Sequence, residues 1–223
     1  SAIADFTQAR DMARAQHSLD ENLIAAVGLI DAYRTANRDP KFNPWPDVQP
    51  ENLQARLYQE AQVRMVAAYA IMDRMPEPSL AKVNAFTNFG LLHNDTGNLP
   101  QALNAYTQAE SIVRELIAAD PQNIDFQNRL ARTLTTKGVT QENLGQLDDA
   151  LASQKEALDL YKQLGDLRGV GNSTISMGDV LAKQDNTDTA KVLYEQAKTG
   201  ATKGNEIIDP DIYNLAVERL AKL

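Results

Sequence analysis

The side chains best suited to acid–base or metal chemistry are few in this sequence, and their spacing does not favour catalysis. The only imidazoles belong to His17 and His93, and neither lies in an HExxH sequence or another spacing typical of metal ligands. Asp148 and Asp149 are adjacent carboxylates where a helix is predicted to begin, and acidic side chains there stabilise the helix dipole. We therefore expect no catalytic residue, no metal site and no cofactor, and we expect His93 to be a half-buried packing residue.

Two loop-like segments resemble ligand-binding loops but lack their essential residues. The sequence Gly169-Val-Gly171-Asn-Ser-Thr174 has no GxxxxGK[ST] pattern, and no strand is predicted before it. Residues 185–188 contain two aspartates but not the glycine and glutamate of a calcium-binding loop. The chain is predicted not to be an enzyme.

Composition narrows the classes of partner. The chain of 223 residues has 22 basic and 30 acidic side chains, a net charge of −8, and no basic stripe, so direct binding of DNA or RNA is not expected. The longest apolar runs, 23–30 and 65–72, are far shorter than the roughly 20 residues that span a bilayer, so no membrane partner is expected. The absence of cysteine fits a reducing compartment and predicts a cytoplasmic location, with secreted and periplasmic locations left open.

One pattern of residues occurs three times between positions 83 and 199. The first copy comprises Phe86, Phe89, Gly90, His93, Gly97, Ala102, Tyr106 and Ala109. The second copy comprises Leu134, Lys137, Gly138, Gln141, Gly145, Ala150, Gln154 and Ala157. The third copy comprises Thr174, Met177, Gly178, Leu181, Asp185, Ala190, Tyr194 and Ala197. The spacing within the pattern is the same in all three copies.

This pattern resembles the tetratricopeptide repeat (TPR), in which each unit is a pair of antiparallel helices, A and B. The joint Ala118-Ala-Asp-Pro-Gln-Asn123-Ile-Asp-Phe126-Gln127 is similar to that of long-period bacterial TPR arrays. The next joint, Leu164-Gly165-Asp166-Leu-Arg168-Gly169, is similar to that of the repeats of kinesin light chains. The resemblance implies an all-α fold, a right-handed α-solenoid of helix hairpins with about ten helices, whose units bury a core only by stacking.

The repeated glycines predict where helix A approaches helix B. We expect Gly90, Gly138 and Gly178 to face Ala102, Ala150 and Ala190, because small residues allow two helix axes to come close. The second copy has Lys137 in place of leucine and Gln154 in place of an aromatic residue. That unit is therefore predicted to have the weakest internal packing, and residues 131–158 are expected to open locally.

Residues 1–80 lack the clear pattern. They are predicted to form helices at 3–17, 20–37 and 51–75 that cap the array, and whether they contain a degenerate repeat stays open. The Pro-rich segment 42–50 contains the only tryptophan, Trp45. Trp45 either contacts a partner from this loop or folds back over a groove between helices.

The predicted organisation is thus an N-terminal helical cap, residues 1–80, followed by a repeat domain, residues 81–223. The repeat domain holds three TPR-like units at about 83–120, 124–165 and 168–202. A last helix at 210–222, with Pro210 in its first turn, is expected to cap the C-terminal end.

The resemblance also implies a binding face, because TPR proteins line a concave wall with fixed positions of helix A. Carried over to this chain, these positions are Asn84, Asn88, Leu91, Asn94, Arg132, Thr136, Val139, Asn172, Ser176 and Asp179. Asn84 and Asn88 are one helical turn apart, and an amide both donates and accepts, which suits pairing with a peptide main chain. The alternative is a polar wall that only keeps the solenoid in solution.

These features predict a non-enzymatic scaffold that binds a protein or peptide segment on its concave face. The alternative, also drawn from the resemblance, is a regulator that responds to a signalling peptide, or a sensor domain of a larger bacterial multidomain protein. Self-association through an uncapped helix is a further alternative.

Overall fold

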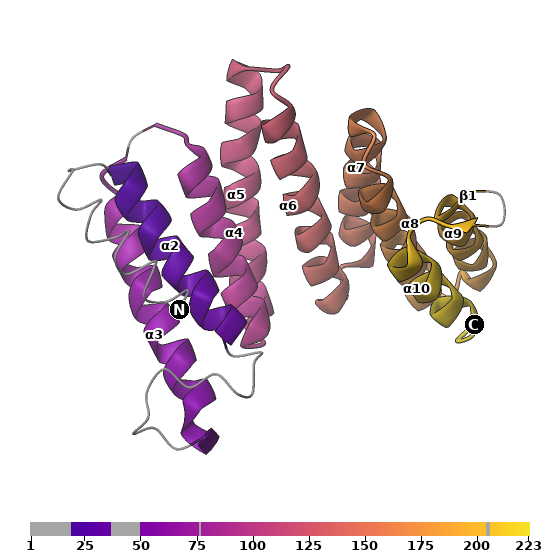
Figure 1. Ribbon diagram of the computed structural model, residues 1–223, viewed down its shortest axis with the longest axis horizontal. Coiled ribbons are helices and arrows are strands. Elements are labelled where there is room, and N and C mark those ends of the chain that lie inside the picture. Colours follow the sequence, from indigo (N-terminus) through magenta and orange to yellow (C-terminus); the bar gives the residue numbers. More distant parts are fainter. Residues whose placement is uncertain (1–18, 37–49, 76, 204–205) are drawn as a thin grey trace. The chain divides into compact units, whose positions relative to one another are not determined.

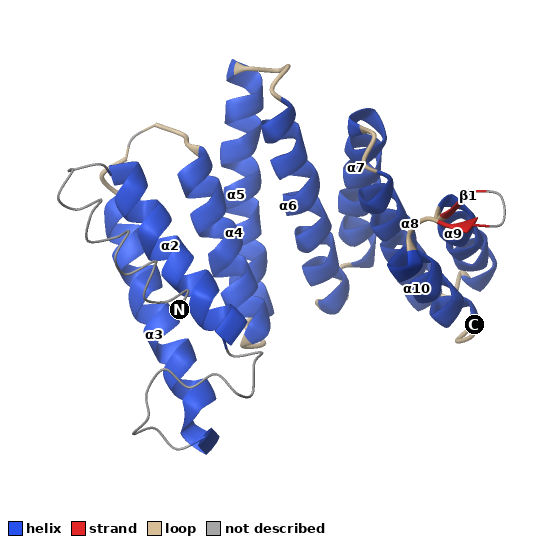
Figure 2. Cartoon of the chain, viewed as in Figure 1, coloured by secondary structure: helices blue, strands red, loops and turns tan. Residues whose placement is uncertain are grey.

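The described part of the chain is all-α apart from one small hairpin (Figures 1 and 2). The computed structural model describes residues 19–36, 50–75, 77–203 and 206–223, and within them it contains nine helices. These are α2 (Leu19–Ala36), α3 (Pro50–Met72), α4 (Leu80–Asp95), α5 (Leu99–Ala119), α6 (Ile124–Asn143), α7 (Leu147–Leu164), α8 (Leu167–Lys183), α9 (Thr187–Gly200) and α10 (Pro210–Leu220). The predicted all-α class is confirmed. The predicted helix at 3–17 and Trp45 lie outside the described residues.

A two-stranded antiparallel hairpin, which was not predicted, precedes α10. Strand β1 (Thr202–Lys203) pairs with β2 (Glu206–Ile207), with Thr202 opposite Ile207. Strands this short carry no alternation of apolar and polar side chains, so no sequence pattern indicates them.

The chain divides into two compact units, residues 1–115 and 116–223, and the boundary falls within α5. We describe each unit by itself. The division predicted from the sequence, at residue 80, concerns repeat content and stays a prediction.

Three helices begin just after a residue whose side chain caps the first turn. Ser79 accepts a hydrogen bond from the backbone N–H of Lys82 at the start of α4, and Asp166 accepts one from Gly169 at the start of α8. Asn123 caps α6 by accepting from the N–H groups of Asp125 and Phe126. Each cap satisfies donors that the first helical turn leaves unpaired, and such a side chain contributes about 1 kcal/mol.

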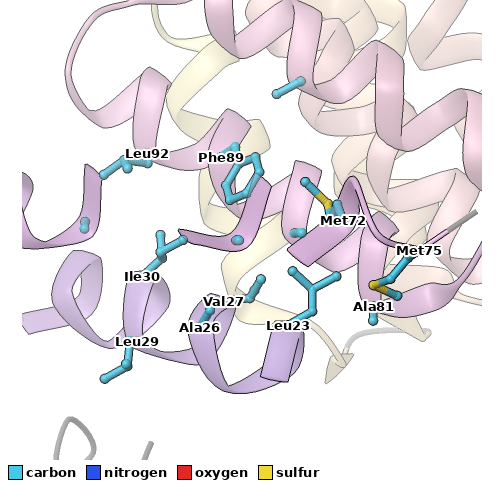
Figure 3. Close-up of a cluster of buried hydrophobic side chains, with 14 of the residues drawn as sticks. Leu23, Ala26, Val27, Leu29, Ile30, Met72, Met75, Ala81, Phe89 and Leu92 are labelled. Atoms are coloured by element: carbon cyan, nitrogen blue, oxygen red, sulfur yellow. The ribbon is translucent and has the colours of Figure 1, made fainter. Parts of the chain in front are cut away.

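The core of the first unit lies between α2, α3 and α4. Figure 3 shows Leu23 and Ile30 of α2 in the same buried cluster as Met72 of α3 and Phe89 of α4. Leu23, Ile30 and Phe89 are fully buried, and burial of each such side chain stabilises the fold by roughly 1.5–3 kcal/mol. Residues before 81 therefore share one core with the first repeat.

Each repeat places its helix A glycine against a large side chain of helix B. A methyl group added at Gly90 would overlap a ring carbon of Tyr106, and one added at Gly178 would stand 2.5 Å from a ring carbon of Tyr194. The atoms nearest to the added methyl groups belong to these rings. The predicted approach of the alanines at the start of helix B stays a prediction. Glycine is required at both positions because the tyrosine ring occupies the space that a Cβ atom would fill.

The α6–α7 pair makes the same contact with an amide instead of a ring. Gln154 is fully buried beside Gly138, and its Nε2 donates to the backbone carbonyl of Thr135 over 3.1 Å. Its Oε1 has no hydrogen-bond partner among the described residues. A buried acceptor without a partner costs about 1–3 kcal/mol. The predicted weakness of this unit stays a prediction.

Replacing the two glycines of the second unit by alanine tests the difference between ring and amide. We expect Gly178→Ala to lower the free energy of unfolding by about 1–3 kcal/mol, because the Tyr194 ring is rigidly packed. We expect Gly138→Ala to cost less, because the contacting atom is the end of a flexible side chain 2.7 Å away. Urea denaturation followed by circular dichroism measures both, and a larger loss for Gly138→Ala would contradict this account.

Candidate protein-binding surfaces

The predicted binding residues of the first unit all lie on α4, and all are half-buried. Asn88 donates from Nδ2 to the backbone carbonyl of Asn84 over 3.0 Å, so one of its N–H groups is used within the helix. Its Oδ1 and the side-chain amide of Asn84 have no hydrogen bond to the described residues. Leu91 adds a half-buried apolar side chain to the same helix. The expected pair of amides is thus present, with part of its hydrogen-bonding capacity already used.

Asn94, the fourth predicted residue of α4, holds the packing of its own repeat. Its Nδ2 donates to the hydroxyl of Tyr106 over 3.1 Å. The ring of Tyr106 is the one that lies against Gly90. Burial raises the pKa of this phenol far above its usual value, so it stays protonated. Asn94 therefore positions Tyr106.

His93 is half-buried on α4, in the repeat's tyrosine position. Burial lowers the pKa of its imidazole below the usual value, because the charged form loses solvation. No group of three or more His, Asp or Glu side chains among the described residues could hold a metal ion.

An ion pair between a buried arginine and a half-buried aspartate side chain, which the sequence did not indicate, joins α2 to the end of α4. Arg34 is only 7% exposed, and its Nε lies 2.7 Å from Oδ2 of Asp95 and its Nη1 lies 3.0 Å from Asp31. Tyr58 of α3 donates to the backbone carbonyl of Asp95 over 3.2 Å. These contacts fix the C-terminal end of α4, next to the predicted binding residues.

On α6, the three predicted residues differ in what they offer. Arg132 is exposed, and Val139 is 38% exposed. The hydroxyl of Thr136 donates to the backbone carbonyl of Arg132 or of Thr133, at 3.1 and 3.0 Å. Thr136 is therefore satisfied by its own helix, whereas Arg132 and Val139 are accessible.

On α8, Asn172 is exposed, Ser176 is half-buried and Asp179 is already engaged. One oxygen of Asp179 accepts from the hydroxyl of Tyr194 and from Nε of Arg219, both over 2.8 Å. Arg219 belongs to α10, so a helix that the sequence predicts only as a cap supplies a cation to this surface. The two members of this pair are far apart in the sequence, and no local pattern indicates such a pair.

A second ion pair links α6 to α8 within the same unit. Nζ of Lys183 lies 2.8 Å from Oε1 of Glu142. Arg132 is the one cation among the predicted binding residues, and the structure adds Arg219 and Lys183 nearby. Both added cations are paired with carboxylates.

The comparisons with known proteins agree with this helix geometry. Residues 129–203 match the family model described as the tetratricopeptide repeat. This stretch, about a third of the chain, is therefore similar to tetratricopeptide repeats. Among solved structures, BtubC (BKLC) from P. vanneervenii is similar in fold, with a TM-score of 0.65 and 18% identity over 99% of this chain and 81% of BtubC. The predicted TPR-like α-solenoid fold is therefore confirmed.

A second solved structure, the MamA protein, matches with a TM-score of 0.48 and 14% identity over 90% of this chain and 92% of that one. That likeness is too low to support an argument. No curated protein sequence matches the chain. No helix among the described residues is long and apolar enough to cross a membrane.

The ionisation of Tyr194, which contacts Asp179, can be used to test the described contact. Burial is the main cause that raises the pKa of the Tyr194 phenol, and the carboxylate of Asp179 raises it further. The folded state therefore keeps the phenol protonated at pH values where the unfolded chain, with a pKa of about 10, ionises. Stability from this group is complete below about pH 10 and declines above it.

We expect the ring signal of Tyr194 in ¹³C-tyrosine NMR to stay unchanged up to about pH 11, one unit above the ordinary tyrosine pKa. Tyr194→Phe assigns the signal. Asp179→Asn should lower the pH at which Tyr194 ionises, because the neighbouring negative charge is lost. A midpoint near pH 10 in the wild-type chain would contradict the described contact.

Proposed function

We propose that the chain is a non-enzymatic scaffold that binds a protein or peptide segment on the helix A faces of its repeats. Protein interaction is the general function of the TPR fold, and the match over residues 129–203 supports it for this chain. The finer proposal concerns which residues make the contact. It is supported best by the two asparagines of α4.

The observation that carries the proposal is the state of Asn84 and Asn88. Both are half-buried on a helix held by Phe89, Tyr106 and the Arg34–Asp95 pair, so their backbone is rigid. The amide of Asn84 and Oδ1 of Asn88 retain hydrogen-bonding capacity. A bound main chain presents alternating donors and acceptors, and an amide on a rigid helix can pair with either.

In the second unit, we propose that the exposed residues Arg132, Val139 and Asn172 contact the partner, with Ser176 beside them. Asp179 retains one oxygen that the described hydrogen bonds do not use. The Asp179–Arg219 pair is held by Tyr194, so it presents a fixed dipole. This pair would orient a polar group of the partner without requiring the partner to carry a net charge.

The alternative of a peptide-responsive regulator differs in its consequence. A regulator would rearrange residues 1–80 when a peptide binds, whereas a scaffold would bind without such a change. Amide exchange of the first unit with and without a bound peptide therefore distinguishes the two.

Substitution of both asparagines tests the scaffold proposal. Peptides are selected on the wild-type chain by phage display, and their affinity is then measured by calorimetry. We expect Asn84→Ala with Asn88→Ala to weaken binding about 10- to 30-fold, because each lost hydrogen bond contributes about 1 kcal/mol.

The matched control is Asn104→Ala, an exposed asparagine on helix B of the same repeat. It should leave the affinity unchanged, and circular dichroism should confirm that both variants fold. Equal affinity of the double variant and the wild-type chain for all selected peptides would remove the proposed role of α4.

A further inference from the structure

A cavity of about 400 Å³ lies in the second unit, among α7, α8, α9 and the start of α10. Most of its lining is apolar, and none of the predicted helix A residues contributes to it. The lining includes Leu158, Val170, Leu193, Ala197, Ile208 and Ile212. Its size and apolar lining are those of sites that bind organic groups, which measure roughly 300–1,000 Å³.

The cavity exists because small residues meet on several elements. Gly171, Ala197, Gly200 and Ala201 all line it. A methyl group added at Gly200 would meet no atom within 4 Å. Ala201 and Ile208, which flank the hairpin, supply another wall, and the N–H of Ile208 donates to the carbonyl of Ala201 over 2.9 Å. The hollow is therefore built into the helix ends.

Large apolar side chains at the cavity are themselves open to solvent. Leu167 is 69% exposed and Ile208 is 47% exposed, and both line it. A small ligand held inside would leave these two side chains in water. An occupant that extends beyond the cavity, such as a peptide, would cover them, and the free energy gained grows with the apolar area covered.

One cation at the cavity is left for an acidic group of the occupant. The lining contains Lys162, Arg168 and the carboxylate of Asp209. Asp209 accepts from the N–H of Ile212 and lies 3.7 Å from Arg168, which also pairs with Asp211. Lys162 is exposed and has no ion pair among the described residues.

We propose that this cavity binds a large apolar side chain of a partner peptide, and that a neighbouring carboxylate of the peptide pairs with Lys162. The site rests on the general function of protein binding but not on the helix A faces. It would remain if those faces bound nothing. The cavity would bind one side chain of the partner, whereas the asparagines of α4 would bind the partner's main chain.

The proposal can be tested by NMR of the full chain with labelled methyl groups. The probe is N-acetyl-aspartyl-phenylalanyl-leucinamide, which combines a carboxylate with large apolar side chains. We expect saturable shift changes at Ala197, Ala201 and Ile212 at millimolar concentration. A probe with alanine in place of phenylalanine should bind about 10-fold more weakly, the loss expected from exposing one large apolar side chain.

A second pair of probes isolates the role of Lys162. The asparaginyl analogue should bind the wild-type chain about 2- to 5-fold more weakly than the aspartyl probe, the range of an exposed ion pair. That difference should vanish in Lys162→Gln. It should persist in Lys155→Gln, the matched control, because Lys155 is exposed on the same helix and does not line the cavity.

Two further variants separate this site from the helix A surface. Gly200→Leu places a side chain in open space, so it should weaken the probe without reducing stability. Asn84→Ala with Asn88→Ala should leave the affinity for the probe unchanged. The cavity proposal and the α4 proposal can therefore fail independently of each other.

Several outcomes would overturn the proposal. Shifts that do not saturate, or that are equally large at the exposed Val63 and Val66 of α3, would mean non-specific contact. Equal binding of the aspartyl and asparaginyl probes would remove the role of Lys162. Shifts of the cavity methyls on dilution of the protein alone would identify a second copy of the chain as the occupant.

Discussion

The close contact between the glycine of helix A and a side chain of helix B is the constraint on which each described repeat depends. In two repeats that side chain is a tyrosine, Tyr106 or Tyr194, whose ring fills the space beside the glycine. The hydroxyl of each ring extends to a predicted binding residue, Asn94 or Asp179. The same two tyrosines thus contact both the interior of their repeat and the candidate surface.

The α6–α7 pair lacks this connection. Gln154 takes the place of the ring and turns its amide to the carbonyl of Thr135, within the core. Its helix A residues Arg132 and Val139 are accessible, while Asn94 and Asp179 are held in place by tyrosines. The repeats therefore offer different groups to a partner. The first and third present polar side chains held by a tyrosine, whereas the second presents exposed side chains without such a contact among the described residues.

The sequence predicted the helix pairs because glycine and alanine recur at fixed spacing in the three copies of the pattern. It did not single out the side chain nearest to each glycine, since the contact position on helix B varies between tyrosine and glutamine. The Asp179–Arg219 pair and the cavity could not be predicted, because each depends on how helices distant in the sequence pack or on small side chains meeting from several elements. The sequence also did not show which side chains bond to the backbone of their own helix. Asn88 is an example, because its Nδ2 donates to the backbone carbonyl of Asn84.

Amide hydrogen exchange of the full chain, read by mass spectrometry, tests most directly whether the glycine contact governs repeat stability. Residues 131–158 and 173–197 belong to the same compact unit and carry the amide and the ring versions of the contact. Local opening should be easier where a buried acceptor has no partner. The account predicts faster exchange in 131–158 than in 173–197. It would be contradicted if 131–158 were the most protected part of the chain.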